Sequence, residues 1–492
     1  MDKLLLGVDI GTSGCKVALF TPDGTVCAQA TAEYAVDYPQ PGWAQQNPDD
    51  WWQAACGAIR EVMHKSGAEP SCVAGIGVDG QSWSAIAMDE NGNVLTFNPI
   101  WTDTRAADIC RELREAIGEE ALFSCSGNPL QPAYTLPKIL WYKKHLPEVY
   151  EKTRWILQSN SYFVYRFTGK VSQDMSQGYG LSCFDMRQRR WNLELAQRIG
   201  IRTELLPPLF ECHEIVGGVT AEAAALTGLK EGTPVVAGGL DAACGTLGAG
   251  VVKAGQTQEQ GGQAGGMSIC LEEYAADERL ILGCHVVPGQ WLLQGGTTGG
   301  GGALKWLRET CCPDLSFEQM SELAEQVAPG SDGVIFLPYM AGERSPLWNP
   351  AAKGVFFGLD YAKGRGHMIR AVMEGVAYSL RHNLETAENA GAKAATLRSM
   401  GGSANSRVWT QLKADITGHA IEVPASDTAT TLGAAILAGV GTGVYQSFEE
   451  AAEKTVAVRR SYEPNSENKA IYDAGYARYL ELYTRLEPMM KG

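Results

Sequence analysis

The sequence lacks an excess of basic residues. Its 41 lysines and arginines are outnumbered by 56 aspartates and glutamates, which gives a formal net charge of -15 and a pI near 5.1. Binding to nucleic acid or to an anionic membrane needs a basic stripe, and the sequence contains none, so we expect neither partner. An anionic nucleotide could still bind through backbone N–H groups, a metal ion and a few local cations.

Segments typical of secreted or membrane proteins are also missing. The first residues, MDKLLLGVDIG, carry one lysine and a short apolar run cut by Asp9, which matches neither a secretory signal nor a membrane span. The 13 cysteines show no CxxC spacing and the seven histidines are dispersed, so no disulfide framework or metal cage is indicated. We expect a cytoplasmic protein with reduced thiols.

The chain is long and rich in glycine. Its 492 residues exceed one ordinary core, so two lobes with a cleft between them are expected. Short apolar strands alternate with helical segments, which predicts an α/β fold. The predicted elements include a hairpin over 4–20, a strand over 73–79, and helices over 51–64, 106–117, 137–145 and 367–390.

A similar order of elements begins again near residue 250. A hairpin is predicted around 260–267, followed by glycine clusters at 295–302 and 401–402 that each precede a helix. The order of hairpin, αβ units, Gly-Gly turn and helix thus occurs once in each half. We predict two related lobes, 1–250 and 251–492.

The first candidate site is the turn after Asp9. A tight turn at Thr12, Ser13 and Gly14 exposes N–H groups that can hold phosphate oxygens, and a neighbouring carboxylate can hold Mg²⁺. Lys16 adds a cation. Because the glycines do not open a helix, a P-loop or Rossmann site is disfavoured. Turn formation alone explains the same residues equally well.

Asp241 is the second candidate, in a turn between a buried strand and a small-residue helix over 234–250. A phosphoryl acceptor needs its hydroxyl oriented and its proton removed, and a positioned aspartate can do both. The alternative is a helix N-cap, a position that aspartate often fills.

Glycine clusters and aromatic residues supply two weaker indications. Clusters at 261–266, 295–302 and 401–402 allow close backbone approach to a nucleotide, although helix packing and turns also use glycine. Trp83, Trp101, Asp103 and Arg105 combine aromatic faces with charge, as sites for polyhydroxylated ligands do. A tryptophan on its own is more commonly part of the core.

Taken in order, these segments resemble the FGGY carbohydrate kinases over residues 4 to about 460. The matching segments are GVDIGTSGCKVALF (7–20), GWAQQNPDDWW (42–52), GVDGQSW (77–83), IWTDTRA (100–106), PKILWYKKH (137–145), GGLDAACGTLGAG (238–250), FLPYMAGERSPLWNPAAKGVFFGL (336–359), HMIRAVMEGVAYSLR (367–381) and MGGSANSRVWTQLKADITG (400–418). So many motifs in one order shift each candidate towards a functional role.

The resemblance implies the actin-like ATPase fold, which is ribonuclease H-like, with ATP and a sugar meeting in the interlobe cleft. It implies ATP and Mg²⁺ as cofactors and Asp241 as catalytic base and sugar ligand, with Asp9 organising the metal. The implied nucleotide contacts are Thr12, Ser13, Lys16, Gly262, Gln263, Gly299, Gly300, Gly401, Gly402 and Asn405, and the implied sugar contacts are Gln81, Ser82, Trp83, Trp101 and Asp103.

Two segments depart from the family pattern. Ser82-Trp83 stands where xylulokinases usually have Met-His, so an imidazole donor is replaced by a bulky indole. Gly262-Gln263-Ala264-Gly265 stands where the family usually has Gly-Thr-Ser-Gly, which removes two hydroxyls beside the γ-phosphate, although the Gln263 amide can donate.

The function predicted from this resemblance is an ATP-dependent kinase for a small sugar or polyol, most like xylulokinase acting on a ketopentose. One alternative is a kinase for glycerol, erythritol or a pentitol. Another is an ATP-binding sugar sensor, pseudokinase or actin-like scaffold without turnover. A heat-shock chaperone is disfavoured, because residues 460–492 are too few for a peptide-binding domain. A homodimer is a further possibility that the sequence leaves open.

Overall fold

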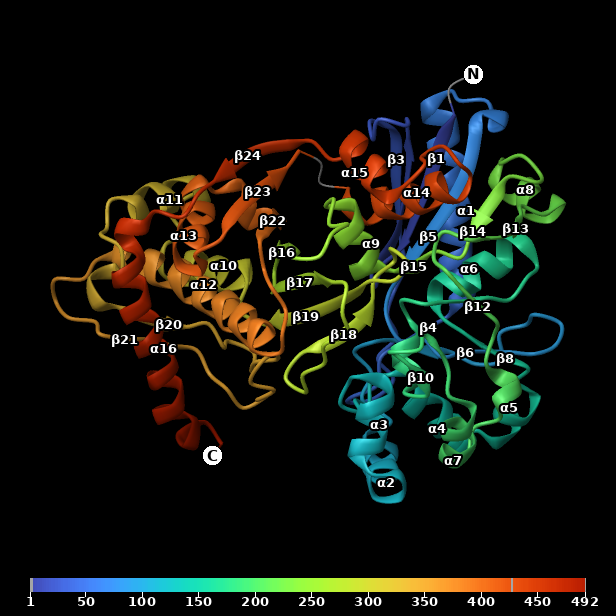
Figure 1. Cartoon of the computed structure of the whole chain (residues 1–492), viewed down its shortest axis with the longest axis horizontal. Coiled ribbons are helices and arrows are strands. Elements are labelled where there is room, and N and C mark those ends of the chain that lie inside the picture. Colours follow the sequence, from blue (N-terminus) through green and yellow to red (C-terminus); the bar gives the residue numbers. More distant parts are fainter. Residues whose placement is uncertain (1–2, 426–427, 492) are drawn as a thin grey trace.

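Two mixed β-sheets form the centres of two lobes that lie side by side (Figure 1). The computed structural model describes residues 3–425 and 428–491. Within these residues each of the two sheets has seven strands, and helices cover their faces. The two-lobed α/β architecture predicted from the sequence is confirmed.

The N-terminal lobe is built on the order β13-β14-β5-β1-β2-β3, with β15 paired to β5 beyond β14. β1 and β2 form the predicted hairpin, and β5 runs parallel to β1. Every residue of β1 is buried because both faces of this sheet are covered. The strands are β1 (Leu4–Ile10), β2 (Gly14–Phe20), β3 (Val26–Glu33), β5 (Val73–Gly80), β13 (Ile215–Gly218), β14 (Pro234–Val236) and β15 (Gly239–Leu240).

The C-terminal lobe repeats this topology in the order β18-β19-β17-β16-β22-β23-β24. β16 pairs antiparallel with β17 on one side and parallel with β22 on the other. In the first sheet, β1 pairs in the same way with β2 and β5. The element-order duplication predicted from the sequence is therefore present in the strand pairing. The strands are β16 (Gln256–Gly261), β17 (Gly265–Leu271), β18 (Ile281–Cys284), β19 (Trp291–Thr297), β22 (Thr396–Met400), β23 (Ala420–Pro424) and β24 (Val458–Tyr462).

The predicted helices are all present, with ends shifted by a few residues. The helix predicted over 51–64 is α1 (Pro48–Ser66), which begins earlier because the Asn47 side chain caps it. The helices that matter for the site are α4 (Thr135–His145), α9 (Asp241–Gly248), α10 (Gly301–Cys311), α12 (Arg365–Asn389), α13 (Arg407–Thr417) and α14 (Ala429–Gly441).

The remaining elements complete the layers and the outer part of the N-terminal lobe. The helices are α2 (Ala107–Ile117), α3 (Glu119–Ser126), α5 (Pro147–Lys152), α6 (Ser159–Thr168), α7 (Leu193–Ile199), α8 (Ala221–Thr227), α11 (Phe317–Glu325), α15 (Phe448–Thr455) and α16 (Lys469–Met490). Short paired strands are β4 (Gln45–Gln46), β6 (Ile86–Met88), β7 (Asn98–Pro99), β8 (Trp155–Leu157), β9 (Gln173–Asp174), β10 (Phe184–Asp185), β11 (Arg190–Trp191), β12 (Leu209–Phe210), β20 (Ile335–Leu337) and β21 (Val355–Phe357). None of the helices among the described residues has the length and apolar character that a membrane span requires.

Helix α14 belongs to the second half of the sequence but packs on the sheet of the first half (Figure 1). A Cβ added at Gly7 would lie 2.0 Å from the Thr431 carbonyl oxygen, and one at Gly77 would lie 1.8 Å from that of Ala434. The helix therefore rests directly on β1 and β5 because these strands have glycine there. The division expected at residue 250 does not hold for this helix, whose first turn reaches the carboxyl end of β1.

Candidate active site

Three carboxylates meet at one edge of the N-terminal sheet. Asp9 is the penultimate residue of β1, and its register partner on the parallel strand β5 is Asp79. Asp79 is in turn paired with Gly239 on β15, and that strand leads directly into Asp241 at the start of α9. Since parallel strands end at the same edge of a sheet, residues more than 200 positions apart in sequence are brought together.

Asp9 is almost fully buried, with 5% of its surface exposed. One of its carboxylate oxygens accepts a hydrogen bond of 2.9 Å from Thr430 Oγ1 in the first turn of α14, and Lys16 Nζ lies 3.8 Å from the same oxygen. Lys16 itself extends into solvent. The predicted proximity of Asp9 and Lys16 is thus present, and α14 adds a contact that the local sequence does not indicate.

Asp241 is the first residue of α9 rather than its N-cap, a position held by Leu240. Its Oδ1 accepts a hydrogen bond of 2.6 Å from the neighbouring N–H of Ala242, and the helix has no side-chain cap. The capping role considered from sequence is therefore absent. Loss of water and the nearby Asp9 carboxylate raise the pKa of Asp241 to about 7, a value suited to a general base.

Asp79 is a site residue that the sequence argument did not select. It is fully buried, and neither carboxylate oxygen has a hydrogen-bond partner among the described residues. Burial, and then the Asp9 and Asp241 charges, raise its pKa well above the usual range. An aspartate at the end of a buried apolar strand was the available indication, but its register with Asp9 comes only from strand pairing.

The first predicted phosphate turn joins β1 to β2. It is closed by a hydrogen bond of 3.1 Å from the Gly11 N–H to the Gly14 carbonyl, and Ser13 is exposed. Trp101 Nε1 donates to Thr12 Oγ1 over 2.9 Å. Trp101, predicted to face the sugar, therefore lies at the edge of this phosphate turn.

The second predicted phosphate turn joins β16 to β17 and packs on the start of α10. The N–H groups of Gly301 and Gly302 donate to the carbonyls of Gly262 and Gln263 over 2.7 and 2.9 Å. These bonds fix the turn that carries the unusual Gln263.

Close packing explains part of the glycine clusters. A Cβ at Gly300 would lie 2.3 Å from the Ala264 carbonyl carbon, and one at Gly299 would lie 2.3 Å from the Pro338 oxygen. Gly402, in contrast, faces open space, while Gly401 adopts a positive φ of 86° beside the Gly261 carbonyl. Asn405, also exposed, accepts a hydrogen bond of 3.3 Å from Arg459. Close packing therefore explains why residues 299 and 300 are glycines, whereas Gly402 leaves room for a ligand.

A buried ion pair supports the nucleotide-side turns. Lys413 Nζ of α13 lies 2.7 Å from a carboxylate oxygen of Glu259 on β16 and 2.7 Å from Ser403 Oγ, and both charged side chains are almost completely buried. The Ser399 hydroxyl donates to the other Glu259 oxygen. This network ties the end of β16 to the segment that follows Gly402.

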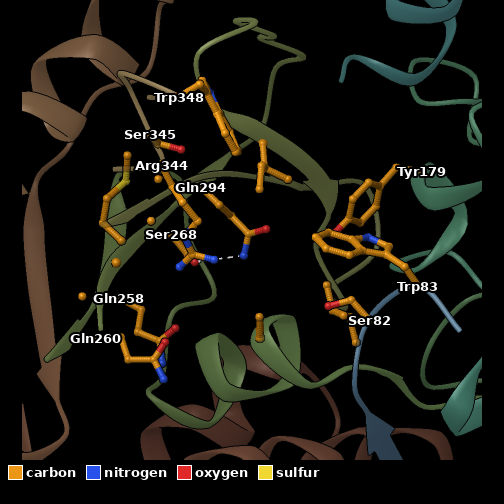
Figure 2. Close-up of a pocket in the computed structure, with 18 residues that line it drawn as sticks. Ser82, Trp83, Tyr179, Gln258, Gln260, Ser268, Gln294, Arg344, Ser345 and Trp348 are labelled. Carbon is orange, nitrogen blue, oxygen red and sulfur yellow. Dashed lines mark hydrogen bonds between the residues drawn. The ribbon is translucent and has the colours of Figure 1, made fainter. Parts of the chain in front are cut away.

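A cavity of about 170 Å³ lies between the lobes (Figure 2). Leu240 and Ala242, which flank Asp241, line it, and Ser82, Trp83 and Tyr179 form its N-terminal wall. The C-terminal wall facing them includes Gln258, Gln260, Ser268, Gln294, Arg344 and Trp348. Of the predicted sugar residues, Ser82 and Trp83 thus reach the cavity.

Gln81 and Asp103 do not line this cavity. Gln81 is buried and donates from Nε2 to Gln46 Oε1 over 3.0 Å. The Asp103 carboxylate is fully buried, accepts from the Ala44 N–H over 2.7 Å and pairs with Arg105 at 2.8 Å. These contacts hold the loop in place, and direct binding of a sugar by Gln81, Trp101 or Asp103 stays a prediction.

The donor set at Asp9 and Asp79 fits Mg²⁺. Carboxylate oxygens are the ligands that this ion prefers, and a buried carboxylate without partners is unfavourable unless a cation or proton compensates it. No group of three or more His, Cys, Asp or Glu side chains within residues 3–425 and 428–491 is arranged to hold a metal. A Mg²⁺ ion here would therefore keep water and phosphate ligands, as it commonly does.

Comparison with known proteins agrees with this architecture. The chain matches the N-terminal domain of the FGGY family of carbohydrate kinases over residues 4–248 and the C-terminal domain over 273–442. It is 32% identical to the xylulose kinase of Bacillus subtilis strain 168 over 99% of this chain and 98% of that protein. It is 30% identical to a gluconokinase of Bacillus licheniformis over 99% and 97% of the two chains.

A solved structure supports the fold directly. The xylulose kinase of Rhodospirillum rubrum superimposes with a TM-score of 0.93 at 30% identity, covering 99% of this chain and 100% of that one. Domain matches, relatives and structure agree over nearly the whole length, so this chain belongs to the FGGY family of carbohydrate kinases.

Proposed function

We propose that this enzyme transfers the γ-phosphoryl group of Mg-ATP to a hydroxyl of a small sugar held in the interlobe cavity, with Asp241 as the general base. As a carbohydrate kinase of this family it uses ATP as phosphoryl donor. The observation that carries the proposal is the position of Asp241. Burial and the Asp9 charge raise the pKa of its carboxylate to about 7, and the residue lies between residues that line the cavity, on the sheet edge that also carries Asp9.

The two hairpin turns face the same reaction from different lobes. Thr12, Ser13 and Lys16 would hold the β and γ phosphates from the N-terminal lobe, while Gly262 and Gln263 would hold them from the other. Asp9, with Asp79 behind it, would hold the Mg²⁺ ion, which supplies charge neutralisation to the phosphate oxygens.

Asp241 would orient the acceptor hydroxyl and accept its proton as the bond to phosphorus forms. Gly401, Gly402 and Asn405 would lie along the adenosine, where Gly402 leaves open space.

A ketopentose is the first candidate acceptor. Xylulose kinases are among the relatives that match this chain over almost their whole length. The cavity wall is also largely neutral and hydrogen-bonding, with serine and glutamine side chains beside two indoles, as suits a polyhydroxylated ligand.

A sugar acid is the second candidate, favoured by Arg344. It is the one charged residue that lines the cavity in the described part of the chain, and its guanidinium forms no hydrogen bond or ion pair there. A cation that faces a neutral pocket is suited to a carboxylate, which it can bind through two parallel hydrogen bonds. The gluconokinase relative matches this chain at 30% identity.

Sugar-dependent ADP release against an ATP-only blank tests the function and separates the two acceptors. The panel pairs xylulose with its alditol and gluconate with neutral glucitol, and adds glycerol and erythritol. A ketopentose kinase gives the highest kcat/KM for xylulose, whereas preference for gluconate over glucitol supports the acid. Replacement of Arg344 by glutamine should then remove only the preference for the acid. If no acceptor stimulates ADP release while ATP binds, the protein is a sensor or pseudokinase. Homodimer formation and a cytoplasmic location stay predictions.

A further inference from the structure

Trp83 has an unusual backbone conformation in the wall of the cavity. Its φ is +58°, in the left-handed region that a bulky side chain seldom adopts. Such conformations are unfavourable and persist where surrounding contacts fix them, which occurs most often at ligand sites. The structure must therefore contain groups that hold this residue.

Both peptide groups of Trp83 are held by side chains from elsewhere in the fold. Its N–H donates to Gln177 Oε1 over 3.2 Å, and its carbonyl accepts a hydrogen bond of 2.8 Å from Lys138 Nζ. The indole packs against Tyr134 and Tyr179, with ring centroids 4.7 and 6.0 Å away. Lys138 lies on α4, behind the cavity wall.

Lys138 also reaches a second loop, which carries Trp101, a residue predicted to contact the sugar. Its Nζ donates over 3.0 Å to the carbonyl of Ile100, the residue before Trp101. One ammonium group therefore joins the segment that carries Ser82 and Trp83 to the segment that carries Trp101. The Lys138 ammonium links these two segments, because two of its three N–H donors bind backbone carbonyls.

The position of Lys138 is an unfavourable one for a cation. The residue is fully buried, and in the described part of the chain it forms no ion pair within 4.0 Å. The nearest compensating charge, Asp103, is already bound to Arg105. Burial lowers the pKa of Lys138 to about 7, only partly offset by Asp103. A leucine or methionine would fill the same core space without this penalty, so the contacts to the two carbonyls are the property that distinguishes lysine here.

We propose that Lys138 is a positioning residue for the phosphoryl acceptor, which acts by holding Trp83 in its left-handed conformation and by locking the 82–83 segment to the 100–101 segment. This inference rests on the proposed function, because it assumes that Trp83 lines the acceptor site. Lys138 does not touch the acceptor itself. Its loss should therefore weaken acceptor binding through Trp83 and leave the nucleotide side unchanged.

Lys138→Met is the first test, because methionine keeps an apolar stem of similar length and removes the ammonium. We expect the KM for the acceptor to rise at least tenfold, with the KM for ATP within twofold of wild type. Lys144→Met is the matched control, since Lys144 lies on the same helix but is exposed, and all its kinetic constants should be unchanged. An unchanged acceptor KM, or an equal rise in both KM values, overturns the proposal.

A test that needs no activity addresses the backbone itself. Glycine adopts a positive φ without strain, so Trp83→Gly removes the need to hold this conformation. If Lys138 has the proposed role, Lys138→Met should change the unfolding equilibrium constant in urea at least threefold less in the Trp83→Gly background than in wild type. Additive effects overturn the proposal.

If Lys138→Met does not fold, Gln177→Leu removes the second anchor of Trp83 and should also raise the acceptor KM selectively. If no acceptor stimulates turnover, the proposed function is contradicted. The comparison of Lys138→Met in the wild-type and Trp83→Gly backgrounds by urea denaturation would still decide the role of Lys138.

Discussion

The two sheets share one topology but treat the buried carboxylates near the ends of their central strands in opposite ways. In the N-terminal lobe, Asp9 on the central strand is the register partner of Asp79 on its parallel neighbour. In the C-terminal lobe, the equivalent pair of strands carries Glu259 and its register partner Ser399, one residue further from the hairpin turn. Glu259 is fully compensated by the Lys413 ammonium and the Ser399 hydroxyl. Asp79 has no hydrogen-bond partner in the described residues.

This difference separates a reactive edge from a supporting one. In the N-terminal lobe, burial and neighbouring carboxylates raise the pKa values of Asp79 and Asp241, which suits these groups to a cation and to a proton acceptor. The satisfied network of the C-terminal lobe fixes the glycine turns that are proposed to face the nucleotide. The same arrangement of strands thus carries the proposed chemistry in one lobe and a supporting network in the other.

The largest expected effect comes from removing the base of the reactive edge. Asp241→Asn should lower kcat by about 10²- to 10⁴-fold, the usual range for loss of a general base, because the amide cannot accept the proton. ATP affinity, measured by calorimetry, should change little. Asp108→Asn on the exposed face of α2 is the control. Turnover near wild type would remove Asp241 from this role.

The pH profile should report the same carboxylate. Because the pKa of Asp241 is raised to about 7, the group is protonated and inactive as a base at lower pH. We expect kcat to fall about tenfold per pH unit below 7, hence about 100-fold at pH 5. A flat kcat between pH 5 and 7 under saturating substrates would contradict this assignment.

In the C-terminal lobe, removing one partner of the buried Lys413–Glu259 ion pair should lower the stability of the protein. Lys413→Met leaves the buried Glu259 carboxylate without its cation and should lower the free energy of unfolding by about 3–5 kcal/mol. Urea denaturation measures this loss. Replacing both partners, Lys413→Met with Glu259→Leu, should restore most of the stability, since no charge is then left unpaired. An equally unstable double variant would argue that packing, rather than charge, is responsible.

Asp79→Asn should raise the free energy of unfolding, whereas Lys413→Met should lower it. The native environment raises the pKa of Asp79, so folding disfavours its ionised form, and this penalty grows as pH rises above the unfolded value of about 4. The amide removes the penalty, so in chelator-treated protein the free energy of unfolding should be higher than in wild type at pH 8. The gain should vanish near pH 4. A loss of stability at pH 8 would show that the carboxylate is compensated.

The smallest expected effect is at Lys16. Its ammonium lies 3.8 Å from Asp9 and the side chain is 64% exposed, so solvent screens the pair. Lys16→Met should change the free energy of unfolding by less than about 1 kcal/mol in urea, although the KM for ATP should rise if the lysine binds phosphate. A large loss of stability would mean that Asp9 depends on this lysine for compensation.

Much of the fold could be predicted from the sequence because its indications are local. The β1–β2 hairpin, the helices α1, α2, α4 and α12, and the repeated hairpin with its Gly-Gly turns follow from hydrophobic periodicity and glycine placement. The position of α14 did not follow, because a helix of the second half packs on the sheet of the first through Gly7 and Gly77. Nothing in the local sequence specifies so distant a partner.

The candidate site divides in the same way. Asp9, Asp241 and the two turns were found because each combines a strand end with glycines or a carboxylate, and the family resemblance joined them. Asp79 was missed because its importance lies in having no partner, a property of the packed interior. Gln81 and Asp103 lie near the predicted place. The Asp103 carboxylate and the Gln81 Nε2 bind neighbouring protein groups, while the Gln81 Oε1 has no hydrogen-bond partner among the described residues.

The sequence by itself determined the elements, their duplication, the residue types available for phosphate and metal binding, and the family. The tertiary structure decided which charges are compensated. Strand register places Asp79 between Asp9 and Gly239. Burial then removes the water that would otherwise give these carboxylates similar pKa values. Electrostatic energies depend on distance and dielectric surroundings, and both are set by residues that are remote in sequence.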